Sequence, residues 1–189
     1  MRALASLSGS REHRVDGLLL LFAIAGCGGG GQYGFAHQYE PLGEERPYMD
    51  RAEELSYEEV RRTRPEEQQL VEWFGVVVEP PQAQEDGTAR VLLSLRAHQD
   101  RHLCGSSSSE TCRVTVSERE IGRFTAIVQI RAEDRSGQRR MWTGSLLKIY
   151  GTATGEESED SGPVMRVEWY RHWPPHYYVT TASAGSMRR

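Results

Sequence analysis

From residue 70 onward the chain is a succession of short segments rich in β-branched and aromatic residues, separated by turn signals. Alternating or continuous apolar runs of this length are typical of strands, and the Gly, Pro, Asp and Ser residues between them indicate turns. We expect strands at 70–79, 88–97, 112–116, 124–131, 145–150 and 164–170, and a last extended piece at 177–181. Helical patterns are nearly absent among them, so the sequence predicts an all-β fold, as a small sandwich or barrel.

Two glycines favour a small OB-like barrel of five to six strands. Gly144 and Gly151 enclose the expected strand at 145–150, which resembles the OB-domain strand that enters and leaves through glycine. Glycine in a strand permits the sharp coiling that a small barrel requires. Glycines at this spacing also occur in sandwiches, so the sandwich remains an alternative. We assign the barrel domain to residues 70–181.

The segments around this domain are polar. Residues 27–48 are rich in glycine and predict a flexible tether. Within a helical segment at 49–69, Asp50 is a candidate N-cap for a short charged helix at about 51–62, and Pro65 ends it. Residues 182–189 are expected to form a flexible tail.

The first 26 residues have the organisation of an export signal. Arg2, Arg11 and Arg14 form a basic region, residues 17–26 are apolar or small, and Cys27 follows. No run reaches the ~18 apolar residues that a membrane-spanning helix needs, but this one has the length of a signal-peptide core. We therefore expect residues 1–26 to be a signal peptide that is removed from the mature protein.

The end of this signal, Ile24-Ala25-Gly26-Cys27, resembles the lipobox of bacterial lipoproteins. The resemblance implies a diacylglyceryl group on the Cys27 sulfur, cleavage before Cys27, and a membrane as partner through the lipid anchor. Gly28 occupies the position where an Asp signals inner-membrane retention in enterobacteria. This favours the outer membrane, facing the periplasm. The alternative is an ordinary secretory signal with a free cysteine nearby.

Two further cysteines fit an exported protein. Cys104 and Cys112 are separated by seven residues rich in serine, and an even pair in an exported chain predicts a disulfide. A more specific alternative is a metal site formed by these two cysteines with His98 and His102, since nitrogen and sulfur ligands suit zinc. Free thiols are the third possibility. We expect the disulfide, with no metal and no cofactor.

Three short pieces resemble the Slp-type outer-membrane lipoproteins and fall in the same order as in that family. They are residues 73–77 (Trp-Phe-Gly-Val-Val), 122–124 (Gly-Arg-Phe) and 144–151, and they span roughly 71–170. The Cys104/Cys112 loop and the aromatic segment after Glu168 are additions to the family pattern. The resemblance implies an outer-membrane location and a barrel fold more than it implies a reaction.

The densest group of functional side chains lies at 168–178, with two tryptophans, three tyrosines and two histidines. Trp169, Trp173, Tyr177 and Tyr178 are candidates for a stacking surface that binds glycan or peptidoglycan. We expect instead that the segment closes the barrel and buries the tryptophans, with the stacking surface as the alternative. We do not expect His172 to be catalytic, because no Cys, Asp or Ser pattern accompanies it nearby.

Net charge and the lack of catalytic motifs exclude several classes of function. The net charge of -4 argues against a general nucleic-acid binder, which needs a basic surface to release counterions from phosphates. No nucleophile elbow, zinc-protease motif or phosphate-binding loop occurs. We therefore expect a non-enzymatic, lipid-anchored envelope lipoprotein with a structural or adaptor role toward another envelope protein. The alternative is a periplasmic module that binds a glycan or a small envelope molecule.

Overall fold

The computed structural model describes residues 35–64, 69–99, 101–104, 114–158 and 160–184. Five long strands dominate it: β2 (Val71–Val77), β4 (Ala89–His98), β6 (Val114–Val128), β7 (Leu146–Ser158) and β8 (Gly162–Trp173). The short strands are β1 (Phe35–Gln38), β3 (Gln82–Ala83), β5 (Arg101–Cys104) and β9 (Tyr178–Thr180). The short helices are α1 (Arg46–Met49), α2 (Tyr57–Arg62), α3 (Ala132–Arg135) and α4 (Thr181–Ala184).

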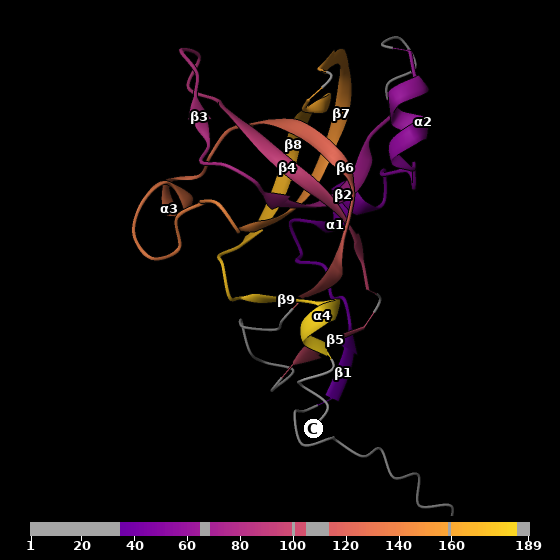
Figure 1. Ribbon diagram of the computed structural model, residues 1–189, viewed down its shortest axis with the longest axis vertical. Coiled ribbons are helices and arrows are strands. Elements are labelled where there is room, and N and C mark those ends of the chain that lie inside the picture. Colours follow the sequence, from indigo (N-terminus) through magenta and orange to yellow (C-terminus); the bar gives the residue numbers. More distant parts are fainter. Residues whose placement is uncertain (1–34, 65–68, 100, 105–113, 159, 185–189) are drawn as a thin grey trace, which may run out of the picture.

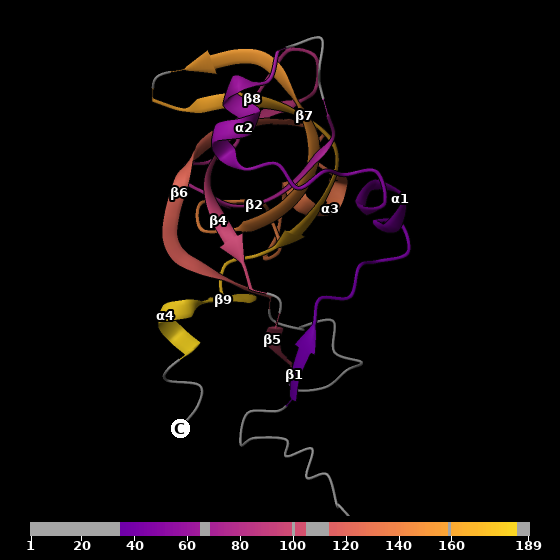
Figure 2. The same cartoon turned by 90° about the vertical axis from the view of Figure 1, so that its right-hand side faces the viewer.

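The five long strands form a closed ring. β2 pairs with β4 and β7, β4 pairs with β6, and β7 pairs with β8, all antiparallel. A parallel pairing of β6 with β8 completes the circle, and Figure 2 shows the strands curving around a common interior. Numbered along the chain, the order is first, second, third, fifth, fourth and back to first, which is an OB-like barrel. The prediction of a small OB-like barrel is confirmed.

Two strands, β6 and β7, are longer than the sequence predicted. The segments expected as separate strands at 112–116 and 124–131 are parts of one strand, β6, whose polar middle still pairs with β4 through a bulge. Likewise β7 continues beyond Gly151 to Ser158, well past the strand expected at 145–150, and forms a hairpin with β8 (Figure 1). A Cβ at residue 151 would lie 2.7 Å from the Arg166 carbonyl oxygen. Glycine there lets the two strands approach at the register shift of the hairpin.

The helix expected at 51–62 begins only at Tyr57. Ser56 is its N-cap and forms a capping box with Glu59: the Glu59 amide donates to the Ser56 hydroxyl, and the Ser56 amide donates to the Glu59 carboxylate. Asp50 instead ends the preceding helix, α1. The expected N-cap was therefore wrong, because the Ser-x-x-Glu pattern satisfies more orphan amides than Asp50 does alone.

The N-terminal segment covers one outer face of the barrel. Strand alternation places Leu147 and Ile149 in the main core, while Lys148 and Tyr150 face outward from β7. Residues 39–50 lie over this face, and Figure 2 shows α1 beside the ring. The expected tether is described from residue 35 on, and its part from Tyr39 to Tyr48 belongs to the packed domain.

The barrel interior is a single apolar core. Val91, Leu93 and Phe124 are fully buried in it, and Trp73 donates its indole N–H to the Leu55 carbonyl. Helix α3 lies between β6 and β7 in sequence and buries Asp134. Among the described residues, no helix is long and apolar enough to cross a membrane.

Candidate functional site

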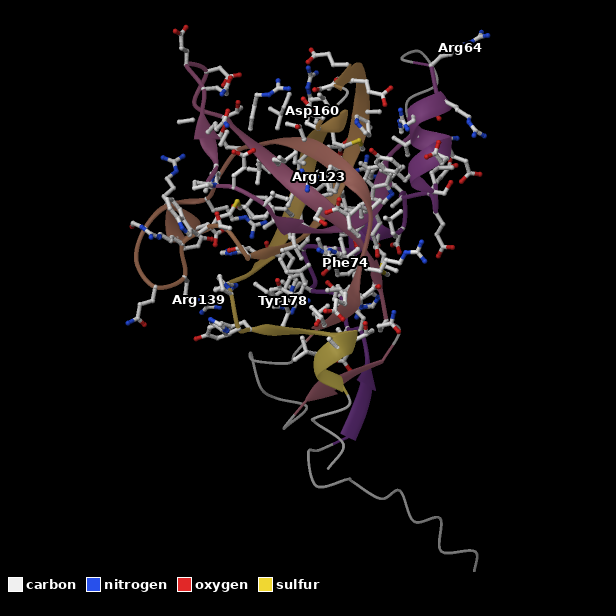
Figure 3. The ribbon with its side chains drawn as sticks, in the orientation of Figure 1. Arg64, Phe74, Arg123, Arg139, Asp160 and Tyr178 are labelled. Atoms are coloured by element: carbon white, nitrogen blue, oxygen red, sulfur yellow. The ribbon has the colours of Figure 1, made fainter. Side chains whose placement is uncertain are left out.

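The four aromatic residues proposed as a ligand surface do not lie on one exposed face. Trp169 is buried and stacks on Tyr48, whereas Trp173 is buried in a second cluster with Phe74. Tyr178 packs against that second cluster, as Figure 3 shows for its position near Phe74, and donates its hydroxyl to a backbone carbonyl. Tyr177 is 41% exposed. Only Tyr177 retains an open ring face, so this segment mainly closes one end of the barrel.

The cysteine predictions lie largely beyond the described structure. Cys27 and Cys112 fall outside the described residues. Cys104 belongs to β5, where its backbone pairs with Phe35 of β1, and its side chain is not among those described. His98 stacks on the Phe74 ring with centroids 4.4 Å apart. Across the described ranges, no group of three or more His, Cys, Asp or Glu residues has the arrangement of a metal site.

A serine, a histidine and an aspartate meet at the end of the barrel next to α3. His172 Nδ1 lies 2.6 Å from Asp134 Oδ1, and His172 Nε2 lies 3.0 Å from Ser145 Oγ. A carboxylate only accepts hydrogen bonds, so in the neutral imidazole Nδ1 carries the proton and Nε2 accepts from the serine hydroxyl. These distances and roles are those of a Ser-His-Asp triad.

The serine of this trio has no access to a substrate. Ser145 is 0% exposed. Its hydroxyl oxygen also accepts a hydrogen bond from the Trp142 amide at 3.1 Å, which closes the turn between residues 142 and 145. A nucleophile must reach the reacting carbon, and this hydroxyl is enclosed and engaged on both sides. The trio therefore serves to hold the turn against β8 and α3.

The aspartate is held as a carboxylate by its neighbours. Burial by itself raises the pKa of Asp134, but hydrogen bonds from His172 and from the Tyr170 hydroxyl, which lies 2.7 Å from Asp134 Oδ2, outweigh it. The net result is a pKa below the usual range of an aspartate. Both carboxylate oxygens thus have donors.

Sequence reasoning missed this trio because its members are far apart in the chain. Asp134 and Ser145 precede His172 by 38 and 27 residues, and each comes from a different element. Only the strand order of the barrel brings α3, the start of β7 and the end of β8 together. The one local signal was Gly144, whose φ of 83° marks the turn that presents Ser145.

Next to the trio is a cleft of about 420 Å³ lined by positively charged side chains. Arg131 and Arg139 come from the segment around α3, and Arg171 comes from β8. Tyr177 and Leu42 form part of the wall, and both are exposed. Figure 3 labels Arg139 on the loop that follows α3. The cleft is thus open to solvent and carries three guanidinium groups.

A second group of polar residues is enclosed beneath the N-terminal segment. Lys148, the only lysine of the sequence, is 1% exposed, and Glu45 is 0% exposed. Lys148 Nζ lies 2.7 Å from Glu45 Oε1 and 3.0 Å from Glu72 Oε1. The hydroxyls of Tyr39 and Tyr150 each donate to Glu45 as well, at 2.7 Å and 2.9 Å from Oε1. We call Glu45, Lys148 and these donors the buried charge cluster.

Electrostatics in the buried charge cluster favour the charged forms of its acid and the neutral forms of its phenols. Burial raises the pKa of Glu45, but Lys148 and the donors around the carboxylate bring that pKa below its ordinary value. Burial, reinforced by Glu72 and Glu45, raises the pKa of Tyr150 well above that of a free tyrosine. Both phenols therefore act as hydrogen-bond donors. The cluster is saturated internally and holds the N-terminal segment on the barrel.

A groove of about 530 Å³ lies between the N-terminal segment and strands β2, β4 and β6. Trp73 and Phe74 line its floor, while Met49 and Ile121 are exposed at its edge. It contains no cluster of reactive groups like that at the end of β8.

Comparisons with protein-family models, with curated proteins and with solved structures found no match. The fold and the site define an OB-like barrel whose N-terminal segment is fastened by a buried ion pair and which carries a basic cleft beside the segment that closes one of its ends.

Proposed function

We propose that this chain is a lipid-anchored lipoprotein of the bacterial cell envelope, held at the outer membrane through Cys27. The observation that carries the proposal is the sequence Ile24-Ala25-Gly26-Cys27 directly after an apolar run of signal-peptide length. Each buried methylene of an acyl chain contributes about 0.8 kcal/mol, so two or three chains bind a membrane durably. The barrel then works in the oxidising periplasm, where the Cys104–Cys112 disulfide is expected to form.

The barrel is proposed to have a structural or adaptor role without catalysis. The burial of Ser145 supports this, because the one triad-like arrangement of the described structure has no exposed nucleophile. Lys148 and Glu45 are likewise enclosed and mutually neutralised. Chemical cross-linking in cells should then recover one stoichiometric protein partner.

The anchor is tested by replacing the cysteine of the lipobox. Wild-type protein, expressed in full length in a bacterium, should incorporate labelled palmitate and have the mass of a chain that begins at a lipidated Cys27. Cys27→Ser should abolish both, while the matched control Cys104→Ser keeps the label. Palmitate on the Cys27→Ser chain, or an intact leader on the wild-type chain, would contradict the proposal. Density-gradient separation of the two membranes then tests the outer-membrane location.

A second candidate function is a ligand-binding module, and the basic cleft favours it. The cleft is open, has a volume of about 420 Å³ and includes the exposed ring of Tyr177. A cleft with an aromatic wall and a few convergent polar groups is the usual form of a small-molecule site. Stabilisation of the protein by a soluble ligand, without a stoichiometric protein partner, would favour this function over the adaptor.

A further inference from the structure

The basic cleft contains more donor capacity than the protein itself uses. Arg139 is exposed and makes no hydrogen bond or ion pair with any residue that the structure describes. Arg131 donates through Nη2 to the Tyr170 carbonyl oxygen at 2.7 Å. Arg171 donates through Nη1 to the Tyr39 hydroxyl and the Glu40 carbonyl oxygen. A guanidinium has five N–H donors, so Arg131 and Arg171 are fixed in place and still have donors to offer.

The acidic residues of the cleft do not cancel this charge. Asp134 is a carboxylate whose two oxygens already accept hydrogen bonds from His172 and from Tyr170. Glu133, the other carboxylate, is exposed to solvent. Three guanidinium groups thus face two carboxylates, which leaves a net positive charge inside a partly enclosed space. Such a charge favours an anion over a cation or a neutral molecule.

The wall of the cleft adds a preference for the rest of the ligand. Tyr177 exposes 41% of its surface there and makes no hydrogen bond through its hydroxyl within the described structure. An aromatic ring with a polar tip and fork-shaped guanidinium donors nearby is suited to a ring-shaped polar molecule that bears an oxyanion. The volume of about 420 Å³ accommodates a molecule of monosaccharide size.

We propose that this cleft binds the phosphate or carboxylate group of a small sugar, with Arg139 as the residue that contacts the anion first. Arg131 and Arg171 are positioning and binding residues held by backbone carbonyls, and Tyr177 provides the surface for the sugar ring. The inference rests on the ligand-binding candidate and is independent of the lipid anchor.

The test uses purified full-length protein in a non-ionic detergent, with calorimetry as the readout. The probes are glucose 6-phosphate, glucuronate, glucose and inorganic phosphate. At least one anionic sugar should bind saturably and more tightly than inorganic phosphate, and glucose should not bind. Arg139→Gln should weaken that binding by about tenfold or more, the effect of losing one charge-assisted hydrogen bond. Arg119→Gln, which removes an exposed arginine of β6 outside the cleft, is the matched control and should leave binding unchanged.

Several results would overturn the proposal. Equal binding of glucose and its anionic derivatives, equal effects of Arg139→Gln and Arg119→Gln, or no binding of any probe would each do so. Vesicles of phosphatidylglycerol and of phosphatidylcholine form a separate arm: binding to the anionic vesicles without binding of the soluble sugars would assign the cleft to lipid headgroups instead. Repeating the titration with the Cys27→Ser chain separates the two proposals, because sugar binding should persist whether or not the chain is lipidated.

Discussion

Replacing Lys148 by methionine should remove the positive charge from the buried charge cluster, while the side chain keeps a similar length. Lys148 is 1% exposed, and its ammonium lies 2.7 Å from a carboxylate oxygen of Glu45, which is itself fully buried. After the substitution, Glu45 keeps hydrogen bonds from Tyr39, Tyr150 and the Leu42 amide. Its nearest remaining positive charge is then farther away, because Arg171 Nη1 lies 3.7 Å from Oε2.

The expected cost is about 3 kcal/mol of the free energy of unfolding. Removing one partner of a buried ion pair costs roughly 3–5 kcal/mol, since it leaves an uncompensated buried charge. Arg171 and the three remaining donors place this variant at the lower end of that range. A loss of this size is a large fraction of the roughly 5–15 kcal/mol that stabilises a typical domain.

Urea unfolding at about pH 7 measures this difference. Arg51→Met is the matched control: Arg51 lies 2.9 Å from Glu168, but the two side chains are 56% and 41% exposed, so its loss should cost less than about 1 kcal/mol. A second variant, Lys148→Met with Glu45→Gln, should recover part of the stability because the fully buried carboxylate at residue 45 is replaced by a neutral amide. If Lys148→Met costs no more than Arg51→Met, the reasoning about burial is refuted.

The same variant should show a distinct pH dependence. In the wild type, Lys148 holds the pKa of Glu45 down against the effect of burial. Without Lys148, burial is less opposed and the pKa of Glu45 in the folded state rises. A raised folded pKa destabilises the fold at high pH, and this penalty fades as the pH falls through it. The difference in stability between wild type and Lys148→Met should therefore shrink on acidification.

Three further outcomes follow from the geometry. Ser145→Ala should cost about 1–3 kcal/mol, measured by urea unfolding, because an imidazole nitrogen and a backbone amide lose a buried partner; a fluorophosphonate probe should label neither chain. Gly151→Ala should lower the unfolding midpoint by the equivalent of roughly 1–3 kcal/mol, since its Cβ would lie 2.7 Å from the Arg166 carbonyl oxygen. The pKa values of Glu45 and Asp134 lie below their ordinary values, so their stabilisation should be complete above about pH 5 and decline as the pH falls further, in a urea series down to about pH 2.

The barrel could be predicted from the sequence because the patterns that indicate strands and turns are local. The period-2 alternation of 145–150 places Leu147 and Ile149 inside and Lys148 outside, as the structure has them. Gly144 and Gly151 mark places where the backbone turns or approaches a neighbour. Strand lengths were harder to predict. The polar residues in the middle of β6 have the composition of a loop, and they form a strand because they pair with β4.

The candidate site could not be predicted in the same way, because its contacts form only when the strands close into a ring. Ser145 and Trp173 are distant in sequence, yet the pairing of β7 with β8 brings their ends together. The burial of Lys148 was hidden for a related reason: alternation gives it an outward position, and an outward lysine normally reaches water. Only the N-terminal segment, which has the composition of a linker, makes that position an interior one.

The lipid anchor that we propose would place the buried charge cluster close to the point where the barrel is attached. With the lipid that we propose on Cys27, eleven residues, 28–38, separate the anchor from Tyr39, which is packed on the barrel. Even fully extended, such a stretch spans at most about 40 Å. The ion pair of Glu45 with Lys148 then lies among the contacts that hold the N-terminal segment on the outer face of β7, after the pairing of β1 with β5 and the packing of Tyr39. A buried ion pair suits that position because its geometry is specific and breaking it is costly, whereas apolar contacts alone would let the segment slide along the strand face.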